Sequence, residues 1–195
     1  MGAGLVWYAA YGSNLSSARL HSYLAGGLPE GGSRAHPGAR DPSPPRADVP
    51  LDLPGALFFA GASSQWGGGG VALYDPTLPG PTAARAYLLT VGQLVDLAAQ
   101  EMYRVPREDD PLEAVLAAPL PGGRHQAGPG LYETLVEVGR RDDLPVLTFT
   151  SPHGRDAARL VPPSAAYADV LFRGLEESRG WSRGEFDAYL ARVTG

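Results

Sequence analysis

Residues 5–15 have the sequence LVWYAAYGSNL, which indicates a strand that runs into a glycine turn. The apolar, β-rich run at residues 5–8 is typical of a buried strand. The YGSN stretch at residues 11–14 breaks that run. An apolar face over Ser16–Leu24 then predicts a helix, with Ser16 or Asn14 as its N-cap. The chain therefore begins with a strand, a tight turn and a helix.

Similar patterns outside this stretch predict the other elements. Strands are expected over Leu53–Ala60, Val71–Tyr74, Ala84–Thr90, Leu131–Val138 and Pro145–Thr150. Helices are expected over Val91–Tyr103, Leu112–Ala118, Ser164–Ser178 and Ser182–Val193. We expect the strands at 71–74 and 84–90 to form a hairpin, and most other strands to be linked in the same way. This mixture predicts an α+β fold, a small mixed β-barrel or curved sheet surrounded by helices.

The length of 195 residues is that of a single domain. Residues 26–50 are rich in glycine and proline. We interpret them as an insertion that forms a long surface loop or a partly disordered segment. The predicted organisation is one domain over residues 1–195 with this insertion.

Composition excludes several classes of function. The formal net charge is −5, and all 16 basic residues are scattered arginines, which argues against a nucleic-acid partner. The chain has no cysteine, and this excludes disulfides, thiol nucleophiles and cysteine metal sites. The apolar run at 5–11 is too short for a signal peptide, and no run is long enough to span a membrane. We expect a cytoplasmic protein without a membrane partner; composition leaves the oligomeric state open.

The turn after the first strand is the first candidate binding site. Its five residues are Tyr11, Gly12, Ser13, Asn14 and Leu15. Successive backbone N–H groups between a strand and a helix can bind a carboxylate, a phosphate or an oxyanion. The alternative is an ordinary turn that uses glycine and asparagine for their backbone freedom.

Glu101 is the candidate acid/base residue. Its position in the helix predicted at 91–103 places it beside the apolar face. Partial burial is expected to raise the pKa of this carboxyl group toward neutrality, which suits proton transfer. The alternative is a solvated helix glutamate.

Two further features fit a pocket. Trp66 precedes four glycines at 67–70, which allow a ligand or another backbone to come close. The alternative is a flexible hairpin loop. Tyr167 begins a helix and would offer a hydroxyl group, although a tyrosine in the core is the more common case. The four histidines lack the spacing of a metal site. A serine hydrolase based on Ser13 and His21 lacks the GxSxG motif.

The order of these pieces resembles the gamma-glutamylcyclotransferase-like family of the YGSN type. The residues that carry the resemblance are the YGSN turn, Arg19, the WGGGGVA stretch at 66–72, the helix sequence LVDLAAQE that ends at Glu101, and Tyr167. They occur in the family's order from about residue 5 to residue 180. The family glutamate is often followed by glycine, whereas Met102 follows here.

The resemblance implies a cyclotransferase that needs no cofactor and no metal. The α-amine of a gamma-glutamyl amino acid or amine would attack its own δ-carbonyl and give 5-oxoproline and the free amine. Glu101 would move the proton, and the Tyr11–Leu15 turn with Tyr167 would bind the substrate. YGSN in place of YGSL argues against glutathione as that substrate. Two alternatives remain: a non-catalytic module that binds a carboxylate or gamma-glutamyl group, and an amide hydrolase that uses Ser13.

Overall fold

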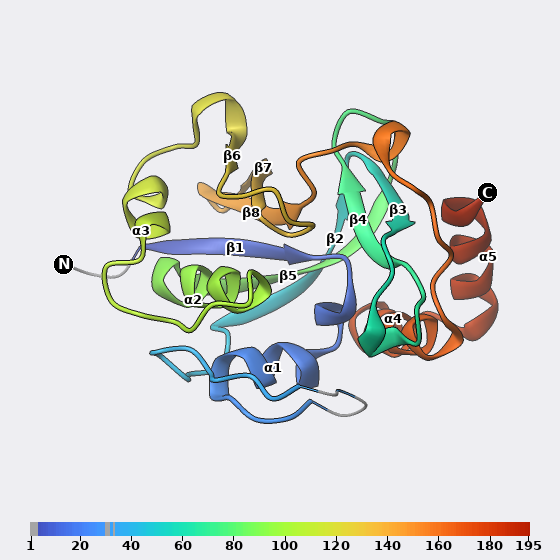
Figure 1. Cartoon of the computed structure of the whole chain (residues 1–195), viewed down its shortest axis with the longest axis horizontal. Coiled ribbons are helices and arrows are strands. Elements are labelled where there is room, and N and C mark those ends of the chain that lie inside the picture. Colours follow the sequence, from blue (N-terminus) through green and yellow to red (C-terminus); the bar gives the residue numbers. More distant parts are fainter. Residues whose placement is uncertain (1–3, 30–31, 33) are drawn as a thin grey trace. The chain divides into compact units, whose positions relative to one another are not determined.

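A computed structural model describes residues 4–29, 32 and 34–195 (Figure 1). Residues 30, 31 and 33 of the glycine- and proline-rich segment lie outside the described residues. The strands are β1 (Leu5–Ala10), β2 (Ala47–Leu53), β3 (Ala56–Ala60), β4 (Val71–Asp75), β5 (Thr82–Thr90), β6 (Arg124–Gln126), β7 (Thr134–Arg141) and β8 (Leu144–Thr150). The α-helices are α1 (Ser17–Ala25), α2 (Val91–Glu101), α3 (Pro111–Leu116), α4 (Ala165–Arg179) and α5 (Arg183–Thr194). Short 3-10 helices cover Ser13–Leu15, Ser64–Trp66, Pro121–Gly123 and Arg155–Ala157.

The strands form a mixed sheet and a separate two-stranded sheet, and this confirms the predicted α+β class. The larger sheet has the order β2-β5-β1-β8-β7-β6. Strand β1 is parallel to β8, with Trp7 opposite Val146, whereas β6, β7 and β8 form an antiparallel meander. A shift of register between Glu137 and Gly139 interrupts the β7–β8 ladder.

Three expectations about the strands are wrong. The strand predicted at 53–60 is two strands, β2 and β3, because Pro54 and Gly55 interrupt it. Strand β4 pairs with β3 in the smaller sheet and does not form a hairpin with β5. Nearly every residue of β5 is buried, and β5 lies between β2 and β1, as a central strand does. Hairpin links are also rarer than expected, since β1 pairs with a strand from the far end of the sequence.

The chain divides into two compact units. The first unit comprises the described parts of Met1–Ala9, Ala18–Asp48 and Ala86–Pro152. The second unit comprises Ala10–Ser17, Val49–Arg85 and His153–Gly195. Glu101 therefore belongs to the first unit, and both the Tyr11–Leu15 turn and Tyr167 belong to the second.

Side-chain caps fix where the helices begin. Helix α2 has a capping box in which the Thr90 hydroxyl accepts from the Gln93 N–H and the Gln93 side chain accepts from the Thr90 N–H, both at 3.1 Å. Ser182 and Glu185 form the same motif at α5. Helix α2 ends at Glu101, two residues earlier than expected, because Tyr103 takes a left-handed backbone with φ 58°.

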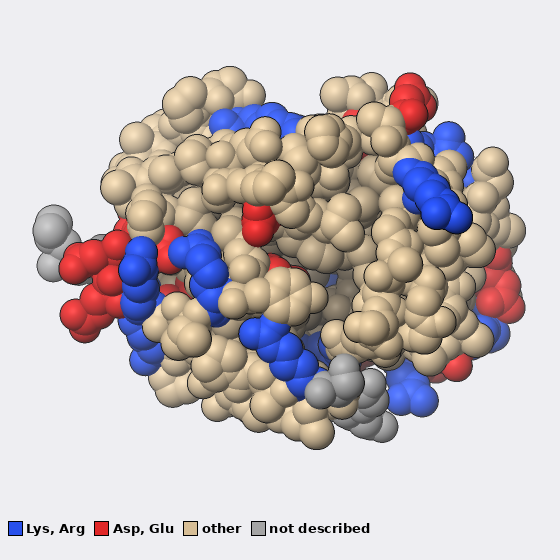
Figure 2. Space-filling model, in the orientation of Figure 1, with Lys and Arg blue, Asp and Glu red and all other residues tan. Residues whose placement is uncertain are grey.

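The outer surface carries both signs of charge. On the face shown in Figure 2, basic side chains lie near acidic ones and are separated by wide uncharged areas. No helix among the described residues is long and apolar enough to cross a membrane.

Candidate active site

Glu101 is the last residue of α2 and is half-buried. The hydroxyl group of Tyr23, from α1, forms a hydrogen bond with the Glu101 carboxylate. Tyr23 is only 7% exposed. Burial is the main reason why the pKa of the Tyr23 hydroxyl is raised well above its usual value, and the negative charge of Glu101 adds to it. Tyr23 therefore stays protonated over the working pH range and acts as a donor to Glu101.

Two further contacts hold Tyr23. Its backbone carbonyl accepts a hydrogen bond from the Gln100 side chain at 2.9 Å. Its ring lies against the ring of His36, with centroids 3.8 Å apart. Burial, and then the positive charges of Arg19 and Arg34, lower the pKa of His36 to about 4. The imidazole is therefore neutral at physiological pH.

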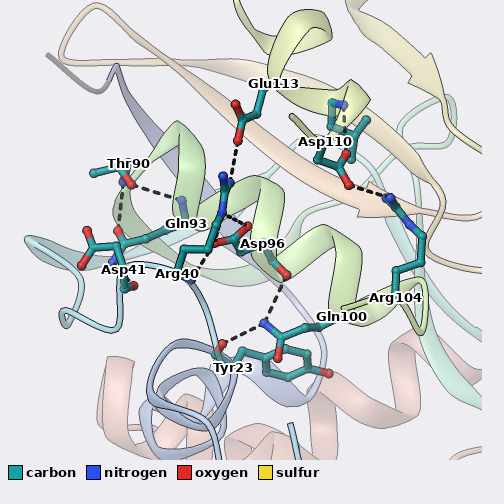
Figure 3. Close-up of polar contacts among 11 residues, drawn as sticks. Tyr23, Arg40, Asp41, Thr90, Gln93, Asp96, Gln100, Arg104, Asp110 and Glu113 are labelled. Atoms are coloured by element: carbon teal, nitrogen blue, oxygen red, sulfur yellow. Dashed lines mark hydrogen bonds and ion pairs between the residues drawn. The ribbon is translucent and has the colours of Figure 1, made fainter. Parts of the chain in front are cut away.

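A polar face of α2 holds the segment that carries His36 (Figure 3). The Gln93 side chain donates to the carbonyls of Asp41 (3.3 Å) and Ser43 (2.8 Å). The Asp96 carboxylate accepts from the Arg40 N–H (2.8 Å) and from Arg40 Nε (2.9 Å). Positions 93, 96 and 100 share one side of a helix.

The Gln100 amide completes this polar face. Its oxygen accepts from the Gly38 N–H at 3.3 Å, while its nitrogen contacts Tyr23 as described above. The described part of residues 36–43 is therefore anchored along α2. The sequence indicates a long surface loop or a partly disordered insertion over residues 26–50, and it does not predict these bonds to α2.

In the second unit, the predicted binding turn is a strand end followed by a 3-10 helix. The Leu15 N–H donates to the Gly12 carbonyl at 2.9 Å, and the Ser16 N–H donates to the Ser13 carbonyl at 3.2 Å. Tyr11, Asn14 and Leu15 are buried, while Gly12 and Ser13 are partly exposed. The accessible part of the turn is thus Gly12 and Ser13.

Tyr167 lies beside this turn. A Cβ atom placed on Gly12 would lie 3.2 Å from the Tyr167 hydroxyl oxygen. The same oxygen accepts from the Ala72 N–H at 3.3 Å. The ring is 2% exposed and packs on Trp66, with centroids 4.8 Å apart. The structure thus brings together Gly12 and Tyr167, two residues that the sequence predicts for one site.

A carboxylate of the protein itself binds the start of α1. The Ser17 N–H donates to Glu177 Oε2 at 3.2 Å, and the Ser17 hydroxyl donates to Oε1. Arg85 forms an ion pair with Glu177 at 2.9 Å and also donates to the Leu15 carbonyl at 3.3 Å. Burial raises the pKa of Glu177, but hydrogen bonds from Ser17 and Arg85 outweigh it and lower this pKa below its usual value. The positive end of α1 therefore already has an anionic partner.

The glycines after Trp66 allow another backbone to come close, which is one of the two approaches that the sequence predicts for them. A Cβ atom on Gly69 would lie 2.4 Å from the Ser164 nitrogen, and one on Gly70 would lie 2.0 Å from the Val161 carbonyl oxygen. The Gly70 N–H donates to the Pro162 carbonyl at 2.9 Å. This contact positions the start of α4 and hence Tyr167.

Sequence reasoning missed the side chains that surround these candidates. Tyr23 contacts His36, which lies within the 26–50 segment, and Glu177 and Arg85 support the turn from distant elements. The only available signal was the i, i+4 spacing of Arg19 and Tyr23 on one helix face. Among the described residues, no group of three or more His, Asp or Glu side chains is placed to hold a metal ion.

The fold is similar to that of solved structures. A solved structure described as a gamma-glutamyl cyclotransferase superposes with a TM-score of 0.56 at 16% identity, over 97% of this chain and 88% of that one. The chain has a gamma-glutamyl cyclotransferase-type fold. An uncharacterized protein from Homo sapiens superposes with a TM-score of 0.54 at 17% identity, over 97% and 88% of the two chains.

By sequence, the chain is similar to a protein whose name differs from that of the fold neighbour. No protein-family model matches the chain. A protein named Histone deacetylase 5 from Arabidopsis thaliana is 33% identical over 201 residues, which is 96% of this chain and 30% of the plant protein. The chain with the cyclotransferase-type fold therefore spans about a third of the length of this curated relative.

Proposed function

We propose that the chain is a cyclotransferase that converts a gamma-glutamyl amino acid or gamma-glutamyl amine to 5-oxoproline and the free amine. The observation that carries the proposal is a half-buried Glu101 that ends a helix of a cyclotransferase-type fold and is held by a buried tyrosine donor. Glu101 is the acid/base residue. The absence of cysteine supports a cytoplasmic location.

The reaction balances without a protein nucleophile. The Glu101 carboxylate takes a proton from the substrate α-ammonium group, and the amine then attacks the δ-carbonyl carbon to close a five-membered ring. Glu101 returns the proton to the leaving nitrogen as the amide bond breaks. The attacking nitrogen gives up a second proton as it becomes the lactam N–H, and this proton leaves with the released amine, which departs as an ammonium ion. Neither step uses a cofactor.

Substrate binding is proposed for the turn and its neighbour. The residues are Tyr11, Gly12, Ser13, Asn14, Leu15 and Tyr167. The partly exposed Gly12 and Ser13 would supply the contact with the glutamyl carboxylate or the oxyanion, while the buried members of the set hold the turn in shape. The partner is a small molecule.

The experiment is a panel of gamma-glutamyl amino acids and amines, with 5-oxoproline as the measured product. We expect product from wild type and a loss of at least ~10²-fold in kcat for Glu101→Gln, because the amide cannot accept the proton. Ser13→Ala tests the amide hydrolase alternative, since a hydrolase would release free glutamate and lose activity in this variant. Undiminished activity of Glu101→Gln would remove Glu101 from the mechanism.

The second candidate is a non-catalytic module that binds a carboxylate or gamma-glutamyl group. It is favoured by the relative in which the matching part is about a third of a longer protein named for another activity. This candidate predicts that gamma-glutamyl ligands raise the Tm although no 5-oxoproline forms with any member of the panel.

A further inference from the structure

Tyr23 supports Glu101 through its hydroxyl group, which is a role beyond packing in the core. Tyr23 is held at three points: its carbonyl by Gln100, its ring by His36, and its hydroxyl by Glu101. Gln100 and Glu101 are consecutive residues of α2. The same end of one helix thus binds both the backbone and the hydroxyl group of Tyr23.

We propose that Tyr23 is a positioning residue that fixes the Glu101 carboxylate for proton transfer. The inference rests on the proposed cyclotransferase function. A hydrogen bond from a fixed donor limits rotation of the carboxylate and favours its ionised form, which is the form that accepts the substrate proton. A tyrosine packed only as an apolar ring would need no such donor at its end.

His36 and the polar face of α2 hold Tyr23 in place. The backbone of His36 is fixed, because its backbone N–H donates to the Gly27 carbonyl at 2.8 Å and its carbonyl accepts from the Gly27 N–H at 3.0 Å. Gln100 binds the Gly38 N–H two residues later. These bonds hold the segment that carries His36 beside α2. The ring contact with Tyr23 makes His36 a second support of that side chain.

The titratable and charged groups around Tyr23 and His36 decide which groups the pH profile of activity will report. Besides burial, the charges of Glu101, Tyr8 and Arg19 act on the pKa of Tyr23. The charges of Arg19 and Arg34 act on the pKa of His36. The arginines keep their charge throughout the accessible range. His36 titrates near pH 4, so a variant that keeps its ring contact but not its titration is needed as a control.

The experiment compares Tyr23→Phe with Tyr103→Phe, which removes the same oxygen from a side chain that is 80% exposed. We expect Tyr23→Phe to lower kcat about 10-fold with little change in KM, since one hydrogen bond to a charged group is lost. The acidic limb of the kcat/KM profile should move to higher pH. Tyr103→Phe should match wild type, and His36→Phe should keep the position of the acidic limb.

A readout independent of turnover separates failure of this inference from failure of the proposed function. Glu101 is half-buried, so water can replace the lost donor and Tyr23→Phe is expected to fold. The carboxyl resonance of Glu101 in protein labelled with ¹³C-glutamate, assigned by its loss in Glu101→Gln, should titrate at higher pH in Tyr23→Phe. An unchanged titration midpoint overturns the positioning role, whether or not the wild type turns over a substrate.

Discussion

The Tyr167 hydroxyl group restricts which side chain position 12 can carry. The distance of 3.2 Å to a Cβ atom at Gly12 is shorter than ordinary van der Waals contact, so the hydroxyl would have to move by a few tenths of an ångström. Tyr167 cannot move easily, because its ring packs on Trp66 and its oxygen bonds Ala72. Glycine at position 12 is therefore explained by a neighbour and not by a left-handed backbone, since its φ is −107°.

A double-mutant cycle tests this contact. Gly12→Ala alone should raise KM for the proposed gamma-glutamyl substrate, because the methyl group displaces the turn or the hydroxyl. Tyr167→Phe removes the obstructing oxygen, so the double variant should lose less than the sum of the two single variants. Substrate titrations of the four proteins measure the coupling. Strict additivity would show that the two residues act independently.

Helix α2 combines two functions on different faces. Its apolar residues are buried in the first unit, while Gln93, Asp96 and Gln100 bind the 36–43 segment. Asp96 has a side chain that is 1% exposed and bonds both the backbone and the side chain of Arg40. Removal of its carboxylate takes the acceptor from the part-buried Arg40 N–H and Nε, while the Arg40 guanidinium keeps its contact with Glu113.

The stability of this anchor can be compared with a surface ion pair of the same chemistry. Asp187 pairs with Arg183 Nε at 3.0 Å, as Asp96 pairs with Arg40 Nε at 2.9 Å, but Asp187 is 58% exposed. We expect Asp96→Ala to lower the free energy of unfolding by about 2–3 kcal/mol, and Asp187→Ala by less than about 0.5 kcal/mol. Urea unfolding of both variants measures the difference. Equal losses would mean that burial does not strengthen the Arg40 contact.

The sequence predicts local elements better than their partners. The strand, turn and helix at residues 5–24 and the capping box at Ser182 follow from nearest neighbours in the chain, and the structure has them. The partner of β4 depends on contacts between distant residues, which a short apolar run does not encode. Glu101 and the turn stay predictions from the family order. The contact of Tyr23 with α2 could not be predicted, because Tyr23 and Gln100 are 77 residues apart in the chain.

At the scale of the whole molecule, His36 and Glu177 are two of the groups that make stability depend on pH. His36 has a pKa of about 4 in the folded state, below its usual 6.5, so the unfolded chain binds its proton first as the pH falls. The contribution of His36 to the free energy of unfolding is complete above pH 6.5 and is lost as the pH falls toward 4. Glu177 also has a lowered pKa in the folded state, and its contribution is complete above its usual value of 4.5 and is lost below that.

The resulting prediction concerns the Tm as a function of pH. We expect a constant Tm above about pH 7, a decline between pH 6.5 and 4, and a steeper decline below 4.5. His36→Phe should remove the upper part of the decline, and Glu177→Gln should weaken the lower part. Calorimetry from pH 3 to pH 8 on the three proteins measures both. A decline in His36→Phe with the wild-type shape above pH 5 would assign it to another group.

The parallel pairing of β1 with β8 has a consequence for how the chain is made. The Thr148 hydroxyl donates to the Ala9 carbonyl 139 residues away, so β1 leaves the ribosome long before this neighbour exists. At ~5–20 residues per second, the wait lasts about 7–30 s. During that time the apolar strand Leu5–Ala10 lacks the neighbour that covers one of its edges and is open to pairing with other nascent chains. Yield of folded protein in the cell should therefore respond to translation speed and to chaperones that hold extended apolar segments.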